Sequence, residues 1–264
     1  MKKKLSIINL ISVLFVLGIN YLSQTATFNN TTIGEISNTY NNLFTPASYA
    51  FAIWGLIFIS LIAYSVYQIR EAFFKSQDTA FIEQTGYWFL FANFLNGCWV
   101  LAFVYDYTGL SVFIMIGILI SLIKIILNTN MECWDAPIGT IAFVWWPICL
   151  YSGWITVATI ANTATYLVKI DWIGFALSEE GWTVAMIIIA MVINILVIMK
   201  RNMREFALVG VWALVAIYMR HKDTIAYIAI TALVCSAILL IVIGTHGYLN
   251  RKTSPYHKLL ERFQ

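Results

Sequence analysis

The sequence predicts an all-α integral membrane protein with eight transmembrane helices. Two observations about composition and order support this fold class. Of the 264 residues, 61% are hydrophobic and only 11% are charged, whereas a soluble domain has about 25% charged residues. The apolar residues are also gathered into eight runs, most of which approach the roughly 20 residues that cross a bilayer. In water, such a chain could not cover its apolar surface with polar groups.

The eight runs are justified in chain order by length and by the turns between them. The first follows three lysines but is as long as a span and lacks a small-x-small cleavage site, so we expect a helix rather than a signal peptide. The fourth follows an Asp-Tyr-Thr-Gly turn, and the seventh is short. The expected spans are 5–22, 47–69, 86–105, 109–128, 138–160, 182–199, 205–219 and 224–244.

The distribution of basic residues predicts the orientation of the spans. With eight helices, 13 of the 16 Lys and Arg residues lie on the side that carries both chain ends. Cells retain Lys and Arg on the cytoplasmic side of a membrane. We therefore expect a multi-pass protein of the cell membrane, with both termini and a basic tail, 245–264, in the cytoplasm. Only Lys169, Arg220 and Lys222 would lie outside.

The first outer loop, 23–46, is polar and contains no Lys or Arg. Connections between neighbouring helices of a bundle usually have about 2–8 residues, so this loop is long. We expect either a solvated linker or a lid.

Several kinds of chemistry have no residues to support them. The three histidines and four cysteines are dispersed at no metal or redox spacing, so we expect no metal site. All 13 acidic residues fall in loops or at the ends of spans. Ionisable groups inside a membrane usually mark proton or ion paths, and their absence argues against proton-coupled transport.

Amides and aromatic rings share one face of the third expected span. Asn96, Trp99 and Phe103 follow one another at helical spacing, and Asn93 lies one turn earlier. Buried amides often join membrane helices to one another, but they can also orient the polar edge of a ligand. Both interpretations are open, and they are not exclusive.

The fifth expected span carries a stripe that contains Pro147, Tyr151, Trp154 and Asn162. Pro147 has no N–H to donate and should kink the helix. Trp146 lies directly before it. Most tryptophans near span ends are interfacial residues, but Trp146 lies several residues inside its span, which favours a role in the bundle.

Residues 44–58, "FTPASYAFAIWGLIF", open the second span with a turn at Thr45-Pro46 and then place Trp54 and Phe58 on one helix face. With the third- and fifth-span motifs Asn96-x-x-Trp99-x-x-x-Phe103 and Pro147-x-x-x-Tyr151, this stretch resembles the tryptophan-rich sensory protein, or translocator protein (TspO/MBR-like), family. The motifs occur in the family's order and on its helices. The resemblance covers about residues 1–166, and the helices of 182–244 are additional.

The resemblance implies a five-helix bundle that binds porphyrins, sterols or similar flat apolar molecules in a pocket opening toward the first outer loop. Counted from the predicted span ends at 1.5 Å per residue, Trp54, Trp99 and Tyr151 lie about 12, 9 and 14 Å deep, so we expect them to converge on one cavity. The expected ligand-binding residues are Pro46, Trp54, Phe58, Asn93, Asn96, Trp99, Phe103, Trp146, Tyr151 and Trp154.

We therefore expect a membrane sensor or binding protein for a tetrapyrrole, a sterol-like molecule or an isoprenoid lipid. One alternative is an integral-membrane enzyme that modifies an isoprenoid or tetrapyrrole, with Asp106, Glu132 or Asp135 as acid or base. Another is a small-molecule transporter that uses all eight helices. The expected partners are membrane lipid and a small apolar ligand, with no nucleic acid and no cofactor beyond a tetrapyrrole ligand. The oligomeric state stays open, a homodimer included.

Overall fold

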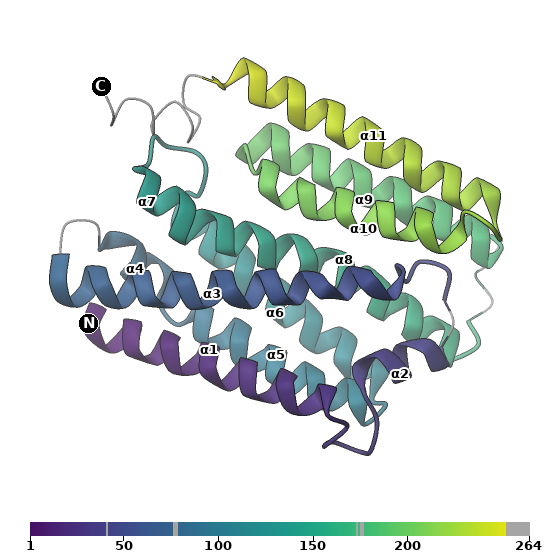
Figure 1. Ribbon diagram of the computed structural model, residues 1–264, viewed down its shortest axis with the longest axis horizontal. Helices are drawn as coiled ribbons and strands as arrows, with labels where there is room; N and C mark the ends of the chain where they lie inside the picture. Colours follow the sequence, from purple (N-terminus) through teal and green to yellow (C-terminus); the bar gives the residue numbers. More distant parts are fainter. Residues whose placement is uncertain (41, 76–78, 173, 175–176, 252–264) are drawn as a thin grey trace. The chain divides into compact units, whose positions relative to one another are not determined.

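The computed structural model describes residues 1–40, 42–75, 79–172, 174 and 177–251, and the regular elements in these ranges are all helices (Figure 1). Each of the eight apolar runs corresponds to one long helix or to a helix with a short 3-10 or π-helical segment before it. Most of the predicted basic tail, from residue 252 on, lies outside the described residues. The all-helical class is confirmed.

The chain forms two compact units whose segments alternate along the sequence. Unit 1 contains Met1–Asn42, Trp54–Asn130 and Ala158–Trp172. Unit 2 contains Leu43–Ile53, Met131–Val157 and the described residues after 173. One long helix, α8, gives its first half to unit 2 and its second half to unit 1. The predicted division into a five-helix bundle, 1–166, and three additional helices stays a prediction.

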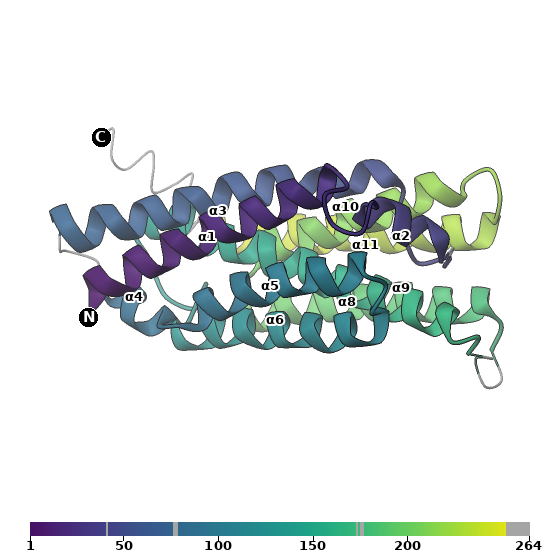
Figure 2. The same ribbon diagram turned by 90° about the horizontal axis from the view of Figure 1, so that it is seen from below.

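Unit 1 is built around three helices that pack along their length, since α5 contacts both α1 and α6 (Figure 2). Small residues let these helices approach: a Cβ added at Gly97 of α5 would lie 2.6 Å from the Phe15 ring of α1. The helices of this unit are α1 (Lys2–Gln24), α2 (Ile33–Thr39), α3 (Ile53–Arg70), η2 (Glu71–Lys75, π-helical), α4 (Ala80–Thr85), α5 (Trp88–Val104) and α6 (Thr108–Asn128).

The loop 23–46 contains a helix that was not predicted from the sequence. Thr32 accepts a hydrogen bond from the backbone N–H of Glu35, and the Glu35 carboxylate accepts one from the N–H of Thr32, so a capping box starts α2. Each half of this motif satisfies a backbone N–H at the helix start. Asn29 further attaches the loop to α5 by donating to the carbonyl of Val104 (3.1 Å). The Thr-x-x-Glu pattern was the signal for this helix.

Unit 2 contains the last three long helices, of which α10 packs against both α9 and α11. Its helices are η1 (Ser48–Ala52, 3-10), α7 (Ile138–Thr140), η3 (Ile141–Trp145, π-helical), the first half of α8 (Trp146–Lys169), α9 (Glu179–Arg201), α10 (Arg204–His221) and α11 (Ala226–Leu249). The π-helical segment η3 ends just before Pro147. Pro147 has no N–H for the carbonyl one turn earlier, which favours a departure from α-helical geometry there.

Helix α8 does not end at residue 160, as the apolar run predicted, but continues to Lys169. The polar residues after 160 end the hydrophobic run without ending the helix, because the segment contains no Gly or Pro. Tyr151 consequently lies roughly 27 Å from the end of its helix at 1.5 Å per residue, whereas the predicted depth of about 14 Å was counted from residue 160 and stays a prediction.

Six helical segments in the described residues are long and apolar enough to cross a membrane, so the chain is a multi-pass membrane protein. Helix α5 is also apolar but has only 17 residues. Helix α10 carries Arg204, Glu205 and Arg220 within its 18 residues. The prediction of eight spans therefore depends on α5 and α10.

Candidate ligand-binding site

The corner at Thr45-Pro46 lies in unit 2, where α10 forms hydrogen bonds with the backbone of the residues that follow the corner. The N–H of Ala47 donates to the carbonyl of Ala216 on α10 (3.1 Å), and the indole Nε1 of Trp212 donates to the carbonyl of Ala50 (3.0 Å). Pro46, which directly precedes the first of these attachment points, is buried. Proline has no N–H that would need an acceptor in such a site.

Two charged or titratable side chains at the end of α10 bind the same corner. Arg220 donates to the carbonyl of Thr45 (2.6 Å), and a ring nitrogen of His221 lies 2.8 Å from the carbonyl of Leu43. A turn exposes backbone carbonyls that no helix satisfies, and each would be costly to bury without a donor. Helix α10 supplies these donors, so it fixes the geometry of the corner.

Trp154 is a large and almost completely buried side chain near this corner, with 1% of its surface exposed. Its ring lies 5.8 Å from the Phe51 ring at an interplanar angle of 85°, an edge-to-face contact. Its Nε1–H is buried and finds no acceptor in the described part of the chain. A buried indole N–H normally has a hydrogen-bond partner.

Close packing of α8 against α10 explains why Trp154 is so deeply buried. The neighbouring Gly153 lies so close to α10 that an added Cβ would be 2.9 Å from the carbonyl oxygen of Phe206. Tyr151, two residues earlier, is fully buried, whereas Trp146 at the start of α8 is 36% exposed. On the predicted stripe of α8, Tyr151 and Trp154 are therefore buried, whereas Trp146 lies beside the stripe and is partly exposed.

On α3, in unit 1, Trp54 and Phe58 share one helix face, as predicted, and their rings stack on each other. Their ring centroids are 5.2 Å apart, and their planes differ by 24°. Both rings are partly exposed. They form a short aromatic surface on the first turns of α3.

The aromatic and amide face of α5, also in unit 1, is buried and hydrogen-bonded to other helices. The Asn96 carbonyl oxygen accepts from the Asn20 amide of α1 (3.2 Å). Trp99 stacks on Phe103 with centroids 5.3 Å apart, and its Nε1 donates to the Asn162 carbonyl oxygen on α8 (3.1 Å). Asn162 in turn donates to the Ser111 hydroxyl of α6 (2.9 Å). These bonds join four helices.

Asn93 takes part in the same pattern, since its amide donates to the hydroxyl of Ser12 on α1 (2.9 Å). Its carbonyl oxygen is buried and accepts no hydrogen bond from the described residues. The interpretation that these amides join helices is therefore supported for Asn93 and Asn96. Asn20, Ser12 and Ser111, which complete the pairs, were missed because single polar residues in apolar runs give no sign of which helix they face.

The structure thus divides the predicted ligand-binding residues between the units. Unit 2 contains Pro46, Trp146, Tyr151 and Trp154, and unit 1 contains Trp54, Phe58, Asn93, Asn96, Trp99 and Phe103. The convergence of Trp54, Trp99 and Tyr151 on one cavity stays a prediction.

The acidic residues considered for catalysis lie in different surroundings. Asp106 binds Lys169 in an ion pair (2.8 Å) and accepts a hydrogen bond from the Tyr40 hydroxyl (2.8 Å). Asp135 is exposed. Glu132 lies beside Cys149 and Glu205, and the potential ligand atoms of these three side chains are within 4.8 Å of one another. We expected no metal site from the sequence, and this group of three potential metal ligands was not predicted.

The family model for TSPO-like proteins matches residues 6–245. The chain belongs to the TSPO-like protein family. This membership implies a membrane protein that binds a ligand. Comparisons with curated proteins and with solved structures give no significant match.

The match also extends beyond the predicted resemblance, which covered about residues 1–166. It includes α9, α10 and nearly all of α11. These helices had been left without a counterpart, but α10 holds the Thr45-Pro46 corner that the resemblance itself singled out. In this TSPO-like protein, the last three helices are part of the family region.

Proposed function

We propose that this TSPO-like protein is a membrane sensor or binding protein for a flat apolar ligand of the tetrapyrrole, sterol-like or isoprenoid class. Trp154 carries the proposal, because a 1%-exposed indole whose N–H has no acceptor in the described chain is prepared for a polar atom from outside the protein. A buried donor without a partner costs about 1–3 kcal/mol. A ligand that supplies an acceptor would remove that cost.

The surroundings of Trp154 favour a flat and largely apolar ligand. Phe51 packs edge-on against its ring, and Tyr151 is fully buried on the preceding turn. Aromatic faces offer a wide stacking surface, and one or two polar groups fix the orientation of a ligand. A carbonyl or carboxylate at the edge of a fused-ring molecule would match the Trp154 N–H. The predicted contacts of Trp54, Phe58 and the α5 residues with ligand remain part of the proposal.

The experiment is a fluorescence titration of the purified, detergent-solubilised protein with protoporphyrin IX, repeated with cholesterol as competitor. Trp154→Phe removes only the N–H and part of the ring, and we expect affinity for protoporphyrin to fall about tenfold, equivalent to roughly 1.4 kcal/mol. Trp182→Phe is the matched control, since its N–H already has an acceptor in the carbonyl of Gly174 and the residue lies outside the candidate site. Equal affinities for parent and Trp154→Phe would contradict the proposal.

The same sample distinguishes binding from catalysis. A chromophore that copurifies and is released unchanged fits a binding protein. Conversion of the added porphyrin to a new absorbing species would instead identify an enzyme, and counter-flow of the porphyrin across proteoliposomes would identify a transporter.

We also propose eight spans in the cell membrane, with both termini in the cytoplasm. The asymmetry of Lys and Arg supports this orientation. Reporter fusions after residues 46, 80, 170 and 264 should give outside, inside, outside and inside, respectively. A C-terminal reporter on the outside would remove this topology and at least one of the eight spans.

A further inference from the structure

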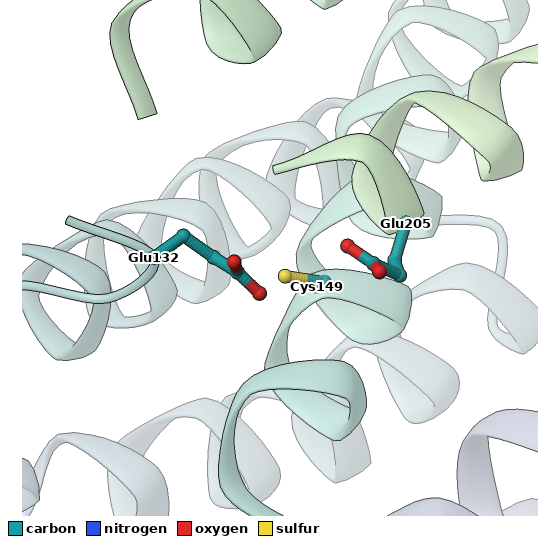
Figure 3. A group of neighbouring side chains, drawn as sticks. All are labelled: Glu132, Cys149 and Glu205. Carbon is teal, nitrogen blue, oxygen red and sulfur yellow. The ribbon is translucent and has the colours of Figure 1, made fainter. Parts of the chain in front are cut away.

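Three side chains from separate parts of unit 2 form a compact group of potential metal ligands. Glu132 comes from the segment between α6 and α7, Cys149 from the first turn of α8, and Glu205 from the first turn of α10. In Figure 3 the two carboxylates lie on either side of the Cys149 sulfur. We propose that Glu132, Cys149 and Glu205 bind one Zn²⁺ ion.

The distances are close to those of a zinc site. The three potential ligand atoms lie within 4.8 Å of one another. Zinc bonds of 2.0–2.3 Å in tetrahedral geometry would place ligand atoms about 3.4–3.7 Å apart. Side-chain adjustments of about 1 Å therefore complete the site without movement of the helices.

The surrounding backbone holds the three side chains in place. Asn202, which ends α9, donates from its side chain to the carbonyl of Glu132 (2.8 Å). The contact of Gly153 with Phe206 fixes the distance between the starts of α8 and α10. Tertiary packing therefore positions the three side chains in the absence of an ion.

Burial and charge provide the second, independent argument. Cys149 is fully buried, and Glu205 Oε2 is buried without a hydrogen-bond donor in the described residues. No ion pair found in the described ranges includes Glu205. Two carboxylates this close repel each other, and burial makes their charge costly. A divalent cation would offset both effects.

The donor set selects the kind of cation. Mg²⁺ and Ca²⁺ prefer oxygen ligands only, whereas a thiolate favours zinc and softer ions. The backbone N–H of Phe206 in the first turn of α10 is directed at the Cys149 sulfur. Three protein ligands leave a fourth position for water. On binding, the Cys149 thiol proton leaves to solvent and the sulfur pair forms the Zn–S bond.

The test uses the full chain in detergent, freed of metal by chelation and titrated with Zn²⁺ against a competing chelating dye. We expect one Zn²⁺ per chain and at least a tenfold loss of affinity in both Cys149→Ser and Glu205→Gln. The matched controls are Cys235→Ser, a buried cysteine on α11, and Glu180→Gln in the first turn of α9; both should bind like the parent.

Co²⁺ in place of Zn²⁺ reports directly on the sulfur ligand. The parent should gain a near-ultraviolet thiolate-to-cobalt band that Cys149→Ser lacks and Cys235→Ser keeps. If Cys149→Ser does not fold, loss of zinc affinity in Glu205→Gln still tests the site. Absence of the cobalt band in the parent, or unchanged zinc affinity in Glu205→Gln, would overturn the proposal. So would an infrared carboxyl band from a proton shared by the two glutamates that persists in excess zinc.

Discussion

The two units use their buried polar groups in different ways. In unit 1, amides and an indole bind one another across helices: Asn20 with Asn96, and Trp99 with Asn162. In unit 2, side chains of α10 bind backbone carbonyls of a corner, while Trp154 Nε1 and Glu205 Oε2 find no partner in the described residues. Unit 1 also contains a buried polar atom without a partner in the described residues, the Asn93 carbonyl oxygen. The units therefore differ in what their bonded polar groups reach: side chains of other helices in unit 1, and backbone carbonyls of the corner in unit 2.

The largest expected effect comes from disturbing the helix contact that shapes unit 2. Gly153→Ala would place a methyl group 2.9 Å from the Phe206 carbonyl oxygen and 3.1 Å from the Val209 Cβ. Because backbone cannot move aside easily, we expect a loss of about 1–3 kcal/mol in unfolding free energy, measured by denaturant titration in detergent. The control is Gly244→Ala on α11, where an added Cβ has nothing within 4 Å. Equal effects would mean that α8 and α10 do not depend on close contact.

Replacing each of the two buried tryptophans by phenylalanine tests the difference between the units directly. Trp99→Phe removes the hydrogen bond to Asn162 and should lower the unfolding free energy by about 1 kcal/mol beyond the packing change common to any Trp→Phe substitution. Trp154→Phe removes an N–H without a partner in the described chain, so this extra loss should be absent. Thermal unfolding of the two variants, without ligand, makes the measurement. A larger loss in Trp154→Phe would contradict the distinction between the units.

A smaller effect is expected at Asn96. Asn96→Leu removes the bond to Asn20 and should cost about 0.6 kcal/mol or more, the usual value for a hydrogen bond between membrane helices. If Asn96 also orients a ligand, its substitution would weaken protoporphyrin binding as well. Stability and affinity measured on the same sample separate these roles. Unchanged stability with weakened binding would assign Asn96 to the ligand alone.

The smallest effect concerns Tyr40, which donates a hydrogen bond to Asp106, the partner of Lys169 in an ion pair of unit 1. The hydrogen bond to Asp106 raises the pKa of Tyr40 above its ordinary value of 10.0. A raised pKa in the folded state means that this contribution to stability is complete below about pH 10 and is lost as the pH rises through the folded-state pKa. Tyr40→Phe should therefore lower the unfolding free energy by less than about 1 kcal/mol at pH 7. It should also remove this part of the loss of stability at alkaline pH. Tyr107→Phe, at an exposed tyrosine, is the control; alkaline unfolding curves of the three proteins should show the difference.

Much of the helical structure was predictable because it depends on local sequence. The apolar runs located every long helix. The spacing of Trp54 with Phe58 and of Trp99 with Phe103 placed each pair on one helix face, and in the structure the rings of each pair stack. The end of α8 was missed because hydrophobicity reports where a segment is apolar, not where its backbone hydrogen bonds stop. Helix α2 was missed although its capping box was visible in the sequence.

The sequence by itself determined the helical class, the apolar lengths and the family, because helical periodicity, hydrophobicity and short motifs are properties of neighbouring residues. Only the tertiary structure decided which polar atoms meet. Asn20 lies 76 residues from Asn96, and Arg220 lies 175 residues from Thr45. The grouping of Glu132, Cys149 and Glu205 likewise depends on how α8 and α10 are rotated and shifted along their axes. Many packings of the same apolar helices bury similar areas, so hydrophobicity alone does not specify rotation or register, whereas each buried hydrogen bond does.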